Sequence, residues 1–373
     1  MNLMTQTRPV KNAIPDAWIN RPAEQTFRSL NELFDFTQME ADASRASNIQ
    51  ANQIVLQTDA DFLDPTSLVR MALQLPDGQV VQPNHYSFGQ MCQLIGAPAG
   101  HYRDLPAPIG VYGLQYKLNT FASELVKAYV RRDTGELRAL TSPTYGRVHD
   151  YKVVDAMRQI AGNGNGDTRW VSATMLHGRE PAFFASDRDM FMFLVDRDNP
   201  IVVGRDPNGN DDVMFRGVFA WNSEVGSRSM GIKEFLFRSY CDNRLVFGTQ
   251  YVEETVIRHT KNAPQKFLEV VRPALELYAN ADASSTVRSI HSAMASVVAK
   301  DDEAAVMLLN RKTDLSIAAA KKALELHMLE ERKPARSAWD MAQAVTAYAR
   351  SVPHQAERVK LESDGGKLLA LAA

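Results

Sequence analysis

The chain has 373 residues, 45% of them apolar, and a formal net charge of −2, which is enough for one large domain or two smaller ones. Cys92 and Cys241 form no C-x-x-C pair, which argues against a disulfide scaffold or a cysteine zinc site and favours a reducing cytoplasm. No apolar run approaches the roughly 18 residues of a membrane helix, and the first residues lack the apolar stretch of a secretory signal. We therefore expect a cytoplasmic protein without membrane association.

Charge is distributed unevenly along the chain. Residues 31–80 carry eight acidic side chains and two arginines, whereas residues 311–360 carry ten lysines and arginines and six acids. A small net charge can hide a basic face when the acidic residues lie elsewhere. Ordinary solvated helix surfaces produce the same pattern, so both interpretations stay open.

The first half of the chain alternates between strand and helix signals. Residues 1–45 are polar and contain several prolines, so we expect an arm or a docking helix outside the core. Residues 50–83 alternate as strands do, with a hairpin turn at Pro76-Asp77-Gly78. Asn84 is the expected N-cap of a helix that ends at Gly96. A short helix after Pro98 and a third helix over about 108–122 follow.

The centre of the chain predicts strands and one helix. Residues 125–132 and 136–142 flank Asp133-Thr134-Gly135, a hairpin signal, and residues 151–161 have the apolar stripe of a helix. Further runs typical of strands cover 170–176, 182–185, 191–195, 201–203 and 213–221. Residues 228–248 fit a helix and a strand equally well.

After Lys261 the composition shifts to Ala, Leu, Glu, Lys and Met, which predicts about four helical segments over 263–350. Thr313 and Ser337 are expected N-caps, and Ser337 with Asp340 forms an acidic capping box. We therefore expect an α+β fold: a central antiparallel or mixed β-sheet with packed helices, followed by a helical C-terminal region. The expected divisions are a polar arm over 1–45, an α+β core domain over 46–261, a helical region over 262–355 and a loose tail over 356–373.

Several motifs match known sites only in part. The glycine run 162–166 lies after a helix and before a strand, the reverse of a phosphate-binding loop, so a flexible connector is expected. Residues 206–212 lack the glycine and glutamate of a calcium loop and predict a polar hairpin tip. No histidine pair, nucleophile elbow or P-loop is present. We therefore expect no catalytic residues, no cofactor and no metal.

Two further patterns have a structural and a functional interpretation. The Asp-Arg-Asp triplets at 187–189 and 196–198 could hold magnesium, but Arg188 and Arg197 would neutralise the carboxylates, so surface ion pairs are preferred. The helical pair over 84–105 could be a helix-turn-helix. Its second segment offers only His101, Tyr102 and Arg103 as donors to DNA, so a packed structural pair is preferred.

The middle of the chain combines cations with aromatic side chains, which suits single-stranded nucleic acid because bases stack on rings and phosphates attract cations. The expected contacts are Arg131, Arg132, Arg147, His149, Lys152, Trp170, Trp221, Arg228, Lys233, Arg238 and Arg244, with Arg138, Tyr145, Arg158, Arg169 and Arg216 in the same segments. The same residues could instead be core and rim. A structural motif of Asn222, Ser223, Glu224, Gly226, Cys241 and Asn243 is interpreted as a bend capped by its own side chains, with Gly226 at positive φ.

Five segments together resemble a known family. They are HYSFGQMCQLIGAPAGHYRDLP (85–106), ALTSPTYGRVHDYKVVDAM (139–157), AFFASDRDMFMFL (182–194), GVFAWNSEVGSRSMGIKEFLFRSYCDNRLVFG (217–248) and SAWDMAQAVTAYA (337–349). In this order they resemble the phage/plasmid-like protein family, whose domain is the domain of unknown function 932. The Asn-Ser-Glu-x-Gly stretch followed by Arg-x-x-Cys-x-Asn is the most specific part, and Arg244 departs from the family, which often has glycine there.

The resemblance implies carriage by phages, prophages or conjugative plasmids in a bacterial host, and it brings no known catalytic residues. The order of the central elements is also loosely similar to phage single-strand annealing proteins, a likeness of topology alone.

Three functional hypotheses follow. The leading one is a protein of DNA metabolism that binds single-stranded DNA, with a role in annealing or recombination and no catalysis. The second is an interaction protein that binds a host factor through the helical region 263–350 or the acidic segment 31–80. The third is a magnesium-dependent nuclease that uses Asp187, Asp189, Asp196 and Asp198. A homo-oligomer is compatible with each, and the leading hypothesis requires one exposed channel lined by the cations and rings.

Overall fold

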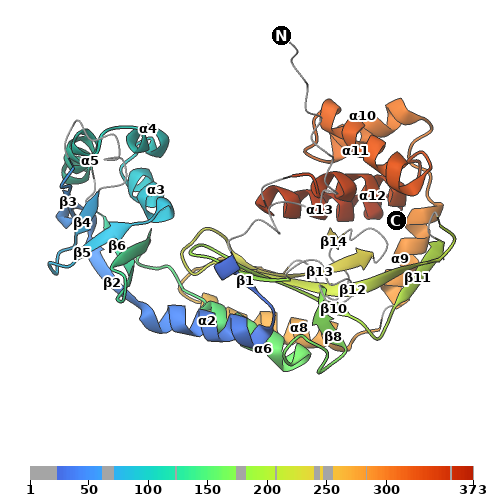
Figure 1. The fold of residues 1–373 in the computed structure, drawn as a ribbon, viewed down its shortest axis with the longest axis horizontal. Coiled ribbons are helices and arrows are strands. Elements are labelled where there is room, and N and C mark those ends of the chain that lie inside the picture. The colour runs from blue at the N-terminus through green and yellow to red at the C-terminus, as the bar shows by residue number, and fades with distance from the viewer. Residues whose placement is uncertain are drawn as a thin grey trace, which may run out of the picture.

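The computed structural model describes residues 23–60, 71–121, 124–173, 182–205, 208–238, 244–246, 255–282, 284–352 and 355–372. They form two lobes, each built on its own β-sheet, and a long helix leads from beneath the larger sheet to the smaller one (Figure 1). The expected α+β fold with packed helices is confirmed. Residues 46–261, where we expected one core, contain two sheets with separate apolar clusters.

The smaller lobe contains a six-stranded mixed sheet. In spatial order its strands are β2 (Ser44–Gln50), β6 (Leu125–Arg131), β7 (Glu136–Thr141), β5 (Val80–Pro83), β4 (Ala72–Gln74) and β3 (Val55–Gln57). Neighbouring strands are antiparallel except for β5 and β7. The helices of this lobe are α3 (His85–Leu94), α4 (Ala99–Arg103) and α5 (Ala107–Phe121). Met91, Leu114 and Leu118 on these helices share a buried cluster with the strands.

The caps and turns of the smaller lobe confirm the local predictions. Asn84 caps α3, because its Oδ1 accepts a hydrogen bond from the Ser87 backbone N–H at 2.8 Å. Gly96 ends the helix with a φ of 60°, and Gly78 in the β4–β5 turn has a φ of 84°. Both values lie in the left-handed region that favours glycine.

The larger lobe is built on a nine-stranded antiparallel sheet. Its strands are β1 (Thr26–Phe27), β8 (Trp170–Ser172), β9 (Phe183–Ala185), β10 (Met190–Asp196), β11 (Ile201–Arg205), β12 (Asp211–Asn222), β13 (Met230–Arg238), β14 (Arg244–Val246) and β15 (Thr255–Ile257). The main path runs β1-β9-β10-β12-β13-β14, with β8 beside β10, β11 beside β12 and β15 beside β13. Pairing with β12 makes β13 a strand, which resolves the ambiguity of the segment after residue 228.

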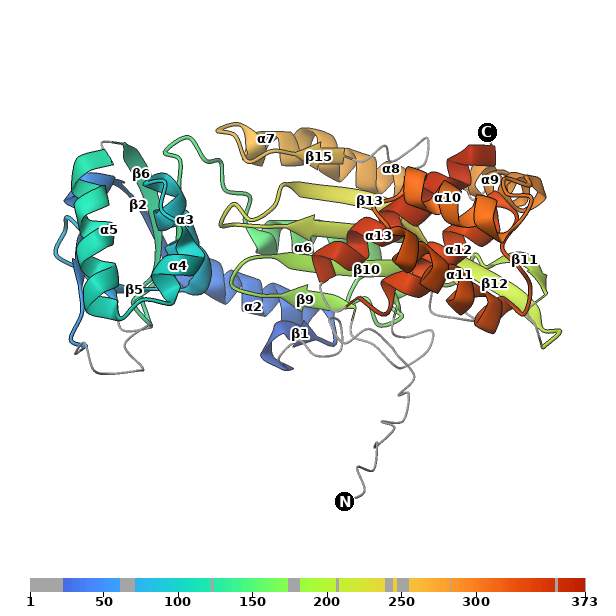
Figure 2. The same cartoon turned by 90° about the horizontal axis from the view of Figure 1, so that it is seen from above.

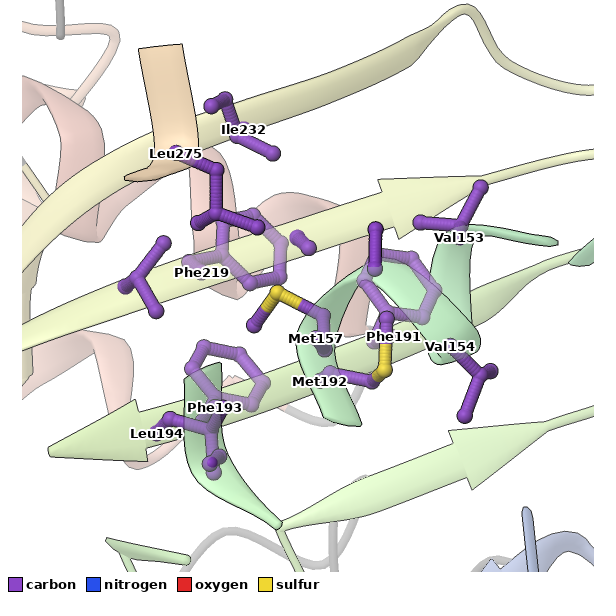
Figure 3. Close-up of a cluster of buried hydrophobic side chains, with 14 of the residues drawn as sticks. Val153, Val154, Met157, Phe191, Met192, Phe193, Leu194, Phe219, Ile232 and Leu275 are labelled. Carbon is purple, nitrogen blue, oxygen red and sulfur yellow. The ribbon is translucent and has the colours of Figure 1, made fainter. Parts of the chain in front are cut away.

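Aromatic rings from β10 and β12 form the centre of the larger core (Figure 3). Phe219 stacks on Phe193 with 4.5 Å between ring centroids and on Phe191 with 5.8 Å. Helix α6 (Asp150–Ala161) contributes Val153 and Met157 to the same cluster. Every residue of β10 is buried, as in a strand covered on both faces.

Helix α2 (Leu30–Ala43) belongs to the larger core, so the expectation of a polar arm over 1–45 is wrong for these residues. Leu30 and Leu33 are fully buried among residues of α6 and β9. The glycine run after α6 is an ordered turn and not a flexible connector. The backbone N–H groups of Leu30 and Asn31 donate to the backbone oxygen and the Oδ1 of Asn163, at 3.1 and 3.0 Å. This turn therefore satisfies donors that a helix start leaves without partners.

A layer of helices follows the strands in sequence, with more segments than the four expected. They are α7 (Ala263–Lys266), a π-helical turn (Phe267–Val271), α8 (Arg272–Asn280), α9 (Ser284–Ala295), α10 (Asp302–Lys312), α11 (Ile317–Glu331), α12 (Ala338–Ala349) and α13 (Gln355–Leu369). Helices α9 to α13 share a buried cluster with side chains from β11, β12 and β13. Within the described ranges, no helix has both the length and the apolar character needed to cross a bilayer.

One expected cap of this helical layer needs correction, and another is confirmed. Thr313 follows α10 and is not an N-cap, because its Oγ1 donates to the Leu309 carbonyl, and Ser316 caps α11 instead. Ser337 and Asp340 form the predicted capping box at α12, with both hydrogen bonds at 3.0 Å.

Residues 356–373, expected as a loose tail, largely belong to α13. Leu361 and Leu368 are buried in the cluster shared by α9 to α13. The adjacent Gly365 and Gly366 lower the helix propensity of this segment. Packing against the rest of the layer outweighs that loss.

Gly217 in β12 gives a test of core packing. A Cβ at this position would lie 2.8 Å from the Leu194 carbonyl oxygen and against the Phe235 ring. We expect Gly217→Ala to lower the free energy of unfolding by about 1–3 kcal/mol, because overpacking a dense core forces neighbours apart. Gly100→Ala is the control, since a Cβ there meets nothing within 4 Å. Equal denaturation midpoints for the two variants would contradict this account of the core.

Candidate functional site

The turn after β12 is buried at the seam between the two lobes. Asn222 Nδ2 donates to the Val148 carbonyl at 2.8 Å and to Asp150 Oδ1 at 2.7 Å. Ser223 Oγ accepts from the Ser227 backbone N–H at 3.0 Å, and Gly226 has a φ of 90°. The predicted bend capped by its own side chains is therefore present. Cys241 and Asn243, the other members of the expected motif, lie outside the described residues.

Glu224 is the centre of this turn and accepts hydrogen bonds from two segments. Arg147 donates to its Oε2 through Nη2 and, at 2.8 Å, through Nε, and the Asp150 backbone N–H donates to Oε1 at 2.6 Å. Burial alone would raise the pKa of Glu224, but the Arg147 guanidinium and the contact with His149 outweigh it and lower the pKa to about 2. Glu224 is therefore a buried anion whose charge is balanced inside the fold.

Asp150 lies beside Glu224 and has the opposite character. Burial and the neighbouring Glu224 carboxylate raise the pKa of Asp150 well above its ordinary value. Two carboxyl groups with separated pKa values are a pattern of acid–base catalysts. Here both groups are buried and hydrogen-bonded to the protein itself. We therefore interpret the pair as a structural lock between the lobes.

Several of the other cations expected to meet phosphate contact polar groups of the protein itself. Arg131 bonds to Glu40 at 2.8 Å and to Asp133 at 2.7 Å, and Arg138 lies 3.6 Å from Glu40. The remaining pairs are Arg132 with the Asp42 carbonyl, Arg169 with Asp196, Arg216 with Glu234, Arg228 with Asp189, and Lys233 with the Ser363 hydroxyl. The side chains of Arg238 and Arg244 lie outside the described part of the structure.

The expected stacking rings are part of the core. Trp170 is 2% exposed and packs on Tyr278. Trp221 stacks on Phe219 with 5.0 Å between ring centroids and covers Gly231. His149 is partly buried against Glu224, and Lys152 is exposed on α6. Both tryptophans therefore pack against the larger core, whereas Arg132 and Lys152 are exposed. An exposed channel for nucleic acid stays a prediction.

The Asp-Arg-Asp triplets form ion pairs and hydrogen bonds and no metal cluster. Asp189 bonds to Arg228 at 3.1 Å, Arg197 to Asp198 at 2.9 Å, and buried Asp196 accepts from Asn199 at 2.9 Å. The described residues contain no group of three or more histidine, cysteine or acidic side chains that could hold a metal ion. The preferred interpretation as ion pairs holds, except that Asp196 is not on the surface.

The helical pair α3–α4 is packed into its lobe. Arg103, the strongest expected donor to DNA, bonds to the His85 carbonyl at 2.8 Å and lies over the Phe88 ring. Met91, Cys92 and Ile95 are buried in the cluster of the smaller lobe. These contacts favour the interpretation as a structural pair.

A groove between α10 and α11, which the sequence reasoning missed, is an open apolar feature of the helical layer. Its volume is about 910 Å³, and it is lined by Val306, Met307, Ile317, Leu324, Met328 and Leu329 together with a few charged residues. Met307 is 54% exposed and Leu329 is 73% exposed. The sequence of α11 contains a signal for this groove. Helix α11 has buried Ala320 and Ala323 on one face and a second apolar stripe on another.

The buried carboxyl pair predicts effects of very different size for two similar substitutions. Glu224→Gln leaves Arg147 without its counter-charge and should lower the free energy of unfolding by about 3–5 kcal/mol. Asp150→Asn removes a carboxyl group that is protonated easily and should change stability by less than about 1 kcal/mol. Urea denaturation at pH 7 measures both.

The pH dependence follows from the lowered pKa of Glu224. Its contribution to stability is present above its unfolded value of 4.5 and is lost as the pH falls towards 2. The effect of Glu224→Gln should therefore shrink over this range. An equal loss of stability in the two variants, or an effect that does not depend on pH, would contradict the assignment of charge.

The comparison with known proteins identifies one family. The model of a domain of unknown function, DUF932, matches residues 139–363, which is more than half of the chain. The matched region begins in β7 and includes the Glu224 turn, most of the larger sheet and helices α7 to α12. No curated protein and no solved structure matches the chain significantly. The chain therefore belongs to the family defined by the domain of unknown function DUF932.

Proposed function

We propose that this protein is an interaction protein whose groove between α10 and α11 binds an amphipathic helix. The observation that carries the proposal is the groove itself, an apolar depression of about 910 Å³ whose lining side chains are partly exposed. Helix-in-groove recognition places apolar side chains of one helix, spaced three or four residues apart, into such a depression. This develops the hypothesis that the helical region 263–350 binds a protein.

The lining of the groove suits a helical partner. Met307 and Met328 present thioether side chains, which adapt their shape to the groups that they contact. Leu329 and Ile317 are 73% and 49% exposed, large fractions for branched apolar side chains. Burying such side chains on binding contributes roughly 25 cal/mol for each Å² removed from water. Exposed apolar patches of this kind commonly mark protein interaction sites.

The charges of the groove restrict the partner. Asp302, Glu303 and Glu325 line it, with Lys321 as the cation among the lining residues. Asp302 bonds to Arg336 and Glu325 to Lys322, but the two carboxylates remain 78% and 63% exposed. A helix with acidic flanks would be repelled, whereas a neutral or basic helix would be accepted. The proposed ligand is therefore an amphipathic helix whose apolar face has neutral or basic flanks.

The groove can be tested with two peptides of about 15 residues that share one apolar face and carry either lysines or glutamates elsewhere. The lysine peptide should bind at least about tenfold more tightly than the glutamate peptide. Leu329→Glu and Met307→Asp should each weaken its binding by a similar factor, as measured by fluorescence anisotropy. Leu277→Glu is the matched control, because Leu277 is 58% exposed on α8. Binding that is equal in Leu329→Glu and the control would contradict the proposal.

Binding of single-stranded DNA stays a prediction from the sequence. The pairing of its expected contacts predicts at most weak binding, with little change between about 50 and 200 mM salt. Anisotropy of a labelled oligonucleotide measures this directly. A steep fall of affinity with salt would show that cations outside the expected set meet phosphate, and it would restore the nucleic-acid hypothesis.

A further inference from the structure

We propose that the helix that fills the groove is α5 of a second copy of this chain, so that identical subunits join head to tail. This inference rests on the proposed function of the groove. It follows from another exposed apolar surface, the outer face of α5, whose helical spacing and lack of acidic residues are compatible with the groove.

The outer face of α5 presents a ridge of Ile109, Tyr112 and Tyr116, which are 45%, 80% and 62% exposed. Their spacing of three and then four residues places them on one face of the helix. The opposite face carries Leu114 and Leu118, which are fully buried. The ridge therefore has the spacing that a groove between two helices recognises.

Helix α5 is held firmly in its lobe. Gln115 Oε1 accepts from the Leu56 backbone N–H at 2.6 Å, and its Nε2 donates to the Ile54 carbonyl at 3.1 Å. The ridge is thus ordered before any partner binds, and docking would not have to fold a helix. Pre-organisation of this kind removes a large part of the entropic cost of association.

The charges of the two surfaces are compatible. No acidic residue occurs between Asp104 and Glu124, and Lys117 is the cation of α5. The groove is lined by Asp302, Glu303 and Glu325. The ridge therefore meets the requirement for an apolar helix with neutral or basic flanks.

The positions of ridge and groove dictate the kind of assembly. Figures 1 and 2 show α5 at the far end of the smaller lobe and α10 and α11 in the helical layer of the other lobe. A concave groove cannot fill an identical groove, so a symmetric groove-to-groove dimer would leave a void. A contact between two different surfaces of identical subunits continues as an open chain or closes into a ring.

Base stacking is the other use of an exposed tyrosine pair. Such a platform needs cations beside the rings to meet phosphate. The ammonium of Lys117, the cation on this helix, is directed to the carbonyls of Ile95 and Gly96 at 3.4 Å. The contacts of Lys117 therefore favour a protein partner for α5.

Two variants that each break one side of the contact test the proposal with the full chain. Leu329→Glu places a charge in the groove, and Tyr112→Glu places a carboxylate on the ridge opposite the acidic lining. By sedimentation velocity, wild-type protein should show a mass that rises with concentration. Each variant alone should dissociate at least about tenfold more readily, towards monomer. Leu277→Glu should behave as wild type, and thermal melting should show that all variants are folded.

The mixture of the two variants gives the decisive result. The intact ridge of Leu329→Glu can dock into the intact groove of Tyr112→Glu, so an equimolar mixture should form a one-to-one dimer that grows no further. Wild-type protein that stays monomeric, or a mixture that stays monomeric while wild type assembles, would overturn head-to-tail docking. Peptide binding by a monomeric wild type would overturn self-docking alone and leave the function of the groove standing. If the wild-type protein neither assembles nor binds the peptide, the groove is not a binding site. Assembly that appears only when an oligonucleotide is added would show that the tyrosines bind nucleic acid. This result would also overturn head-to-tail docking.

Discussion

The buried carboxylate of Glu224 is the constraint on which the centre of the molecule depends. A carboxylate removed from water is stable only with a cation and hydrogen-bond donors around it, and here Arg147 and the N-terminus of α6 supply them. Arg147 comes from the segment between β7 and α6, and Glu224 from the turn after β12. The Tyr145 hydroxyl donates to the Ser223 carbonyl, and Gln90 on α3 donates to the Val225 carbonyl. Residues from both lobes thereby bond to the same turn, and Glu224 is its ionised member.

The same rule explains which partners several of the central arginines find inside the fold. Glu40 on α2 balances Arg131 and Arg138 at the border of the smaller sheet. In the larger lobe, Glu234 lies beside Arg216. Glu40 is distant in sequence from both of its arginines, whereas Arg131 also bonds to the nearby Asp133 and Glu234 lies on the strand next to that of Arg216. These arginines connect elements inside the fold, and other residues determine the charge of the surface.

Local structure could be read from the sequence where the signal is local. The Asn84 cap, the Gly78 turn and the capping box of Ser337 each depend on residues within a few positions of one another. The pairing of Arg147 with Glu224 joins residues 77 positions apart, and no periodicity reveals such a partner. An exposed arginine that meets phosphate and a buried one that meets a carboxylate are identical in the sequence. The sequence alone therefore cannot separate arginines that stabilise the fold from arginines that bind a ligand.

The elements that were assigned wrongly also depend on distant partners. Leu30 on α2 and Leu361 on α13 lie in segments that look polar or weakly helical, and both are buried by contacts with other parts of the chain. The groove was missed for the converse reason. The second apolar stripe of α11 resembles an ordinary core face, and only the fold shows that no described element covers it.

A rigid seam gives the proposed assembly its geometry. The ridge on α5 and the groove between α10 and α11 belong to different lobes, so the angle between successive subunits is the angle between the lobes. A flexible junction would let this angle vary, and head-to-tail docking would then give irregular chains of no fixed form. The buried ion pair at the seam is costly to break, and we therefore expect it to limit this variation from one subunit to the next. In this view Glu224 takes no part in binding any partner, yet it determines whether repeated binding produces a regular structure.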